Sequence, residues 1–229
     1  MSKLPETDYL IITDGGGFRK EDKEYDASSA FLIFHRPDAR HQRMDQSAHM
    51  DSAGMVTPGK TMAYAEMCAI ALALERLLPH IMALPEKERK LTTIRVYTDS
   101  NNCFKTLTAW IYSWLKRGGN GITSPFRNSE GKVVLHQDAI MRAFVTKSQL
   151  QELGAVVKFY HINSHTAKKK RGDTRILFQQ YNDCLISKED FYFLHEMNKV
   201  CDALVKETYY AYKETGNRYN EAGVKEYYR

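Results

Sequence analysis

Near its N-terminus the chain reads Tyr9-Leu10-Ile11-Ile12-Thr13-Asp14-Gly15-Gly16-Gly17, an apolar run that ends in a carboxylate and three glycines. A second run, Ile94-Arg95-Val96-Tyr97-Thr98, ends in Asp99. Short apolar runs bounded by turn residues are typical of buried strands, so both aspartates are predicted to lie where a strand stops. Carboxylates gathered from neighbouring strand ends raise one another's pKa unless a cation lies between them. The pattern therefore predicts a divalent-cation site, for which Mg²⁺ is a natural occupant.

The segments around these two runs predict a mixed sheet with helices. Further strands are expected at residues 27–35, 47–56 and 155–163, and helices at residues 61–78, 100–118, the later part of 133–153, and 198 to about 213. The glycine-rich segment 118–131 is predicted to be a loop. Strands joined first locally and then through helices imply an α/β fold, with a mixed five-stranded sheet and helices on both faces.

Length and composition favour one domain. The chain has 229 residues, of which 43% are hydrophobic, enough for a single substantial core. We expect a catalytic domain over residues 1–213, an irregular insertion at about 166–196, and a tail at 214–229. The first strand begins almost at once, so no separate N-terminal binding module is expected.

The charge and the cysteines limit the class of protein. There is no apolar stretch long enough to span a membrane and no signal-like N-terminus, so a soluble, cytoplasmic protein is expected. We also expect a monomer. The four cysteines contain no C-x-x-C pair, which argues against a zinc knuckle and a disulfide framework. A net charge of +5, with basic clusters at 116–117 and 168–171, permits a polyanionic partner.

Glu66 is the third candidate carboxylate. On a helix it shares an apolar stripe with Ile70, Ala73 and Leu77, whereas Glu75 falls on the opposite, solvated side. An acid in a buried stripe points to function. The alternative is that Glu66 lies in a frayed first turn, where acids favour the helix dipole.

Three carboxylates remain ambiguous when taken singly. Asp14 could begin an Asp-Gly hairpin turn, and Asp99 could cap the helix that follows it. Asp202 could be an ordinary acid in the first turn of the last helix.

In combination the motifs resemble type I ribonuclease H. The resemblance rests on Asp14-Gly15-Gly16, Ala65-Glu66-Met67-Cys68-Ala69-Ile70, Tyr97-Thr98-Asp99-Ser100 and Asn198-Lys199-Val200-Cys201-Asp202-Ala203-Leu204. Residues 110–118 are similar to the helix and basic handle with which cellular members grip substrate. The resemblance is spread over most of the chain.

The resemblance implies an endonuclease that cuts the RNA strand of RNA–DNA hybrids and leaves 3′-hydroxyl and 5′-phosphate ends. It implies two Mg²⁺ ions, with Mn²⁺ as a substitute, held by Asp14, Glu66, Asp99 and Asp202. It also implies that His165, beyond the fifth strand, assists proton transfer or product release. His161, expected within that strand, is the rival for this role.

The same resemblance implies a set of substrate contacts. Gly15 and Gly16 would allow close backbone approach, and Asn101 would reach a base edge or sugar. The handle would hold the DNA strand through Trp110, Trp114, Lys116 and Arg117. Either tryptophan could instead belong to the core, because they are spaced at i, i+4.

Two features depart from the family pattern. Met62 and Ala63 stand where many relatives carry asparagines, so the contacts to 2′-hydroxyls are expected to differ. The span between His165 and Asp202 is unusually long and contains Lys168-Lys169-Lys170-Arg171. We hypothesise that these four residues add phosphate contacts, so neutralising them should reduce the salt dependence of binding.

Two other functions remain open from the sequence. A junction resolvase or transposase-like enzyme would use similar acids on DNA, although the handle argues against it. A catalytically silent nucleic-acid-binding module is disfavoured by the four acids, because carboxylates facing phosphates weaken binding when no metal is present.

Overall fold

The computed structural model describes residues 5–20, 24–162 and 186–221. Its sheet has the strand order β5-β4-β1-β2-β3-β6. The strands are β1 (Thr7–Arg19), β2 (Tyr25–Arg36), β3 (Ala48–Pro58), β4 (Thr92–Thr98), β5 (Val156–His161) and β6 (Tyr219–Asn220). Strand β1 pairs antiparallel with β2 and parallel with β4, and β4 pairs parallel with β5. The predicted mixed sheet is confirmed, with one more strand than expected.

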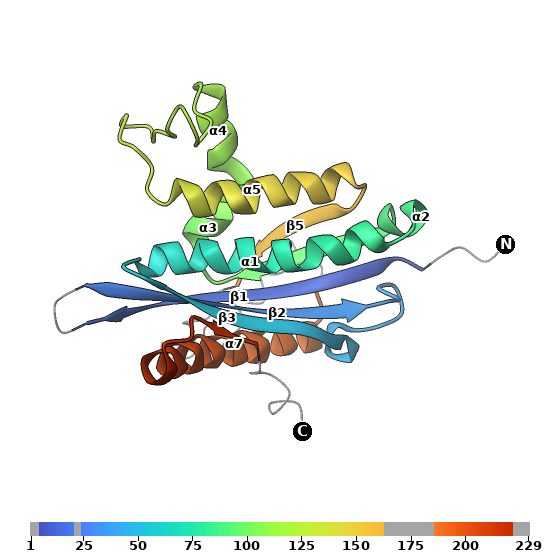
Figure 1. Cartoon of the computed structure of the whole chain (residues 1–229). Helices are drawn as coiled ribbons and strands as arrows, with labels where there is room; N and C mark the ends of the chain where they lie inside the picture. The colour runs from blue at the N-terminus through green and yellow to red at the C-terminus, as the bar shows by residue number, and fades with distance from the viewer. Residues whose placement is uncertain (1–4, 21–23, 163–185, 222–229) are drawn as a thin grey trace.

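Helices cover both faces of the sheet (Figure 1). Helices α1 (Met62–Ala83) and α5 (Gln137–Glu152) lie on one side, and α7 (Lys188–Thr215) lies on the other. The shorter elements are η1 (Met44–Gln46), α2 (Glu86–Arg89), α3 (Asn101–Lys105), the π-helical turn η2 (Thr106–Trp110) and α4 (Ile111–Lys116). No helix among the described ranges is long and apolar enough to cross a membrane.

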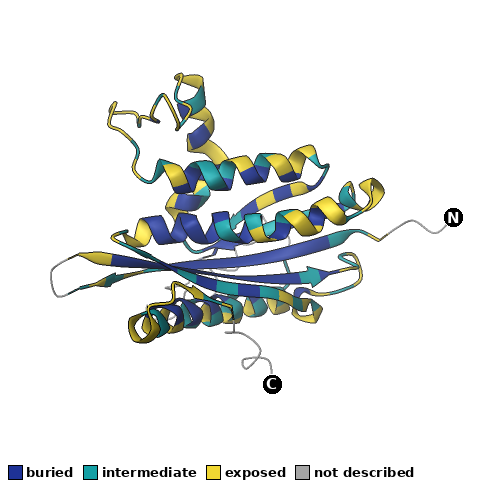
Figure 2. Cartoon of the chain, viewed as in Figure 1, coloured by how far each residue is buried: buried dark blue, intermediate teal, exposed yellow. Residues whose placement is uncertain are grey.

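The apolar run of β1 is the centre of the molecule. Tyr9 and Ile11 belong to the core beneath α1, whereas Leu10 and Ile12 belong to the core beneath α7, because successive side chains of a strand point to opposite faces. All four are at most 1% exposed. Figure 2 shows β1 buried along most of its length. A strand buried on both faces has to be apolar throughout, as this one is.

The predicted end of β1 at Asp14 was wrong. The strand continues through the three glycines to Arg19, and β2 pairs with it throughout, from Asp8↔Arg36 to Arg19↔Tyr25. Only the parallel pairing with β4 stops here, at Thr13↔Thr98. Asp14 therefore lies in mid-strand beside the end of its parallel neighbour, which excludes the hairpin turn.

The last helix begins ten residues earlier than predicted. Ser187 caps it by accepting a hydrogen bond from the backbone N–H of Asp190, and the helix then runs to Thr215. Its first three turns carry Leu194 into the core beneath the sheet. The predicted irregular segment at 166–196 is thus helical from Lys188 onward, and its earlier part lies outside the described residues.

The chain returns to the sheet after α7. Gly216, at φ 73°, ends the helix in the left-handed conformation that glycine adopts without strain. Tyr219 and Asn220 then pair with β3, and Val56 N–H donates to the carbonyl of Arg218 at 2.8 Å. This short β6 is the strand that the sequence did not reveal, and it covers part of the outer edge of β3.

Candidate metal centre and substrate groove

Gly15 seats helix α1 against the middle of β1. A Cβ atom at Gly15 would lie 2.3 Å from the backbone nitrogen of Glu66 and 2.6 Å from the carbonyl carbon of Ala65. These contacts are shorter than a side chain can tolerate, so only glycine lets the two backbones approach so closely. Ser29 on β2 fastens the same turn by donating its hydroxyl to the carbonyl of Ala65 at 2.9 Å. The close approach brings the side chain of Glu66 near that of Asp14.

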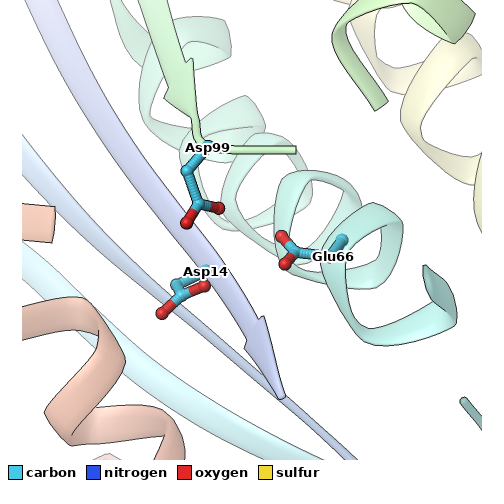
Figure 3. A group of neighbouring side chains, drawn as sticks. All are labelled: Asp14, Glu66 and Asp99. Carbon is cyan, nitrogen blue, oxygen red and sulfur yellow. The ribbon is translucent and has the colours of Figure 1, made fainter. Parts of the chain in front are cut away.

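Three carboxylates converge at this point. One oxygen from each of Asp14, Glu66 and Asp99 lies within 4.8 Å of the others (Figure 3). They come from β1, from α1 and from the residue after β4. Asp14 is 6% exposed and Glu66 is 8% exposed, so two of the three are removed from water. This group, the acidic trio, matches three of the four predicted acids.

The electrostatics of the acidic trio call for a cation. Burial raises the pKa of Asp14 to about 8, and the charge of Asp99 adds to the effect. Burial also raises the pKa of Glu66 well above its ordinary value, helped by Asp14 and Asp99. A divalent cation between these oxygens would restore the ionised forms.

The donor atoms fit a hard divalent ion. The trio offers carboxylate oxygens, which Mg²⁺ prefers. The buried Oε2 of Glu66 has no hydrogen-bond partner among the described residues. A buried polar atom without a partner is costly, and coordination to a metal would satisfy it.

Asp202 borders the same cavity but does not join the trio. The cavity measures about 670 Å³ and is lined by residues of β1, α1, α3 and α7, with Asp202 in its wall. The Oδ2 atom of Asp202 lies 2.5 Å from Nζ of Lys206, one helical turn further on, and both side chains are about half exposed. The structure thus places the fourth predicted acid at the site, engaged by a lysine.

Of the two candidate histidines, only His161 lies among the described residues. His165 lies outside the described residues, so its predicted role stays a prediction. His161 is the last residue of β5, as expected, and its Nε2 lies 3.1 Å from the backbone carbonyl oxygen of Asp99. This contact ties the end of β5 to the turn that carries Asp99.

The predicted handle lies beside a second groove. Trp110 is 40% exposed, whereas Trp114 is 6% exposed and packs against Phe126, with ring centroids 5.4 Å apart. Trp114 is therefore the member of the pair that belongs to the core. Lys116 and Arg117 are exposed, and Arg117 donates to the carbonyl of Arg127.

This second groove measures about 760 Å³ and shares part of its lining with the acidic cavity. Trp110, Trp114 and Arg117 lie in its wall, and Lys116 lies outside it. Ala63, Asn102 and Cys103 line both hollows. The two hollows are therefore neighbours, and the groove extends from the acidic cavity's lining toward the handle.

Three further predicted substrate contacts lie in β1 and at the start of α3. Asn101 is exposed at the start of α3, and its neighbour Asn102 lines both hollows. Gly15 and Gly16 do line the cavity, but their Cβ positions are taken by α1 and by Val205 of α7, so the glycines are needed first for helix packing.

Asn198 was missed as a site residue. It is 4% exposed, lines the cavity and has a buried Oδ1 without a partner among the described residues. Its position one turn before Asp202 on the same helix face was a usable signal.

Comparison with protein-family models identifies the family of the chain. The model of RNase H matches residues 6–175, which include the acidic trio. The chain belongs to the RNase H family. The family and the fold expected from the sequence motifs are thereby confirmed.

Individual members of the RNase H family match over smaller parts. A ribonuclease H of Neorickettsia sennetsu is 39% identical over 66 residues, which are 29% of this chain and 39% of that protein. The chain therefore matches about two fifths of the length of this relative.

Two solved structures are similar to the chain at low sequence identity. A foamy viral protease-reverse transcriptase in complex with RNA/DNA hybrid superposes with a TM-score of 0.50 at 13% identity, covering 73% of this chain and 19% of that one. The solution structure of the PFV RNase H domain gives a TM-score of 0.49 at 15% identity, covering 80% and 99% of the two chains.

Proposed function

We propose that the protein is a divalent-metal-dependent endoribonuclease that hydrolyses the RNA strand of RNA–DNA hybrids. The observation that carries the proposal is the acidic trio, in which a buried oxygen of Glu66 has no partner among the described residues. Membership of the RNase H family supports the substrate class.

The four acids have distinct places in the proposed chemistry. Asp14, Glu66 and Asp99 would hold one ion between them, and Asp202 would complete the position of a second. Two bound Mg²⁺ ions, or Mn²⁺ in their place, supply a water of lowered pKa and stabilise charge on the leaving 3′-oxygen, which leaves 3′-hydroxyl and 5′-phosphate ends.

The protein's own part is to hold these oxygens rigidly. Asp14 accepts a hydrogen bond from the backbone N–H of Gly15 at 2.8 Å, which orients its carboxylate. His161 bonds the backbone that carries Asp99. Such preorganisation lowers the cost of reaching the transition state, since the charges need not be rearranged during the reaction.

The groove beyond the cavity would receive the hybrid. Trp110 and Arg117 present an aromatic face and a guanidinium in its wall, a combination suited to a sugar-phosphate backbone. Lys116 would add charge at the rim. Asn101, exposed at the start of α3, is proposed to reach a base edge or sugar, beside Asn102 in the lining of both hollows. His165 is proposed to assist proton transfer or product release.

The test compares four substrates with one isosteric variant. Matched RNA–DNA hybrid, duplex RNA, duplex DNA and a four-way junction are incubated with Mg²⁺ and the wild type, Glu66→Gln or Glu86→Gln. Glu86 is an exposed acid paired with Lys90 and serves as the matched control. We expect cleavage of the hybrid alone, a loss of that cleavage in Glu66→Gln because a metal ligand is removed, and its retention in Glu86→Gln.

The other outcomes identify the competing functions. Cleavage of the junction or of duplex DNA would indicate a DNA-directed member of the wider superfamily. Binding of the hybrid without cleavage at any Mg²⁺ or Mn²⁺ concentration would indicate a silent binding module. Either result contradicts the proposal.

A further inference from the structure

Lys206 forms an ion pair with Asp202, the fourth of the predicted acids. Its Nζ lies 2.5 Å from Oδ2 of Asp202, and both residues line the acidic cavity. The ammonium therefore lies against a carboxylate oxygen of the fourth acid.

The lysine and the acid are both tied to one rigid element. They lie four residues apart on α7, a spacing that places an acid and a following lysine side by side on a helix. The same helix is held against the sheet by Cys201, which is buried and whose thiol lies 3.4 Å from the carbonyl oxygen of Ala30. The ion pair therefore forms without any rearrangement of the backbone.

We propose that Lys206 is a built-in counter-ion that competes with the second metal ion for Asp202. The inference rests on the proposed function, since it concerns the metal position to which Asp202 would contribute. Binding at this position requires the ammonium to leave the carboxylate oxygen that it contacts. Lys206 thus raises the Mg²⁺ concentration at which the position at Asp202 fills.

The exposure of the pair sets the size of the effect. Both side chains are about half exposed, and exposed ion pairs contribute only a small interaction free energy. Replacement of Lys206 by a neutral residue is therefore expected to strengthen binding at Asp202 about three- to fivefold, not by orders of magnitude.

Lys206→Met tests the proposal, because methionine keeps a long unbranched side chain and removes the charge. Lys199→Met is the matched control. Lys199 lies on the same helix, lines the same cavity and is equally exposed, but its Nζ bonds Glu196 at 2.6 Å. The Lys199→Met substitution removes the same charge but leaves the ion pair between Asp202 and Lys206 in place. Lys206→Arg is expected to retain the wild-type behaviour.

Two measurements are made on each variant. The first is calorimetric titration of the full chain with Mn²⁺ alone, without nucleic acid. The second is the Mg²⁺ concentration that gives half-maximal cleavage of the hybrid. We expect Lys206→Met to lower the half-saturating concentration about three- to fivefold in at least one of them, and Asp202→Asn in the same chain to abolish the change.

Three results would overturn the inference. These are unchanged concentrations in both measurements, an equal shift in Lys199→Met, and a shift that persists in the double variant with Asp202→Asn. Circular dichroism checks that each variant is folded, and Lys206→Gln replaces Lys206→Met if it is not. Failure of the proposed function is distinguishable, because the wild type would then bind no Mn²⁺ or cleave no hybrid.

Discussion

Thr13 of β1 and Thr98 of β4 form the last pair between these parallel strands. The next residues are Asp14 and Asp99, so the register itself places two carboxylates side by side at the same end of the sheet. The third carboxylate arrives from α1, whose position depends on a glycine. The geometry of the site is therefore set by backbone pairing and helix seating, which suggests where substitutions should act.

Gly15→Ala should damage both stability and activity. The added methyl group would meet the backbone of Glu66, which cannot turn aside as a flexible side chain can. We expect a loss of about 1–3 kcal/mol in the free energy of unfolding, measured by urea denaturation, and a large fall in kcat.

Gly17→Ala is the matched comparison for this glycine. A Cβ atom there would lie 3.0 Å from Cβ of Met62 at the exposed start of α1. A smaller loss of stability is expected, with activity largely kept. Equal losses of stability in the two variants would contradict a specific requirement for glycine beneath the backbone of Glu66.

Without metal, the protein should lose stability as pH rises from about 4 to about 8. The pKa of Asp14 is raised to about 8 in the folded state, so between these values the unfolded chain releases a proton that the folded chain keeps. The contribution is present in full below pH 4 and is lost as pH passes through 8. Thermal melting in EDTA measures it, and Asp14→Asn should flatten the slope.

Mg²⁺ should reverse this pH dependence. The ion binds the ionised carboxylates, so the rise in Tm that it causes should be larger at pH 8 than at pH 5. Asp14→Asn should reduce that rise at pH 8. An equal Mg²⁺ effect at both pH values would argue against the acidic trio as the binding site.

The two tryptophans should separate stability from binding. Trp114→Ala removes a ring from the core and should cost about 3–5 kcal/mol of unfolding free energy. Trp110→Ala should change stability by less than about 1 kcal/mol, since the ring is 40% exposed, and should raise KM for the hybrid. The idea of a substrate-gripping Trp110 fails if KM is unaltered.

Removal of the residues after Gly216 should promote self-association. The truncation uncovers the edge of β3 at Gly54 and Met55, where β6 now pairs. An exposed strand edge is a template for pairing with another chain. Sedimentation velocity of the truncated and full chains would show this as additional dimer or larger species, and identical profiles would contradict it.

The sequence predicted the fold well where the patterns were local. The apolar run at residues 9–13 was recognised as a strand, and Glu66 was recognised from its helix stripe. The extent of β1 beyond Asp14 was not predictable, because three glycines carry a turn signal and only pairing with β2 keeps them extended. The pairing of Asp202 with Lys206 depends on rotamers, and β6 depends on a contact with β3 that is distant along the chain.

The position of Asp14 within β1 has a dynamic consequence. Its strand is buried from both sides and paired with a neighbour on each edge as far as Thr13, so its backbone amides should exchange with deuterium only when the whole domain unfolds. The acidic trio would then not unfold locally while the rest of the domain stays folded. Catalytic competence and the folded state should disappear together along a denaturant series, as a single cooperative event.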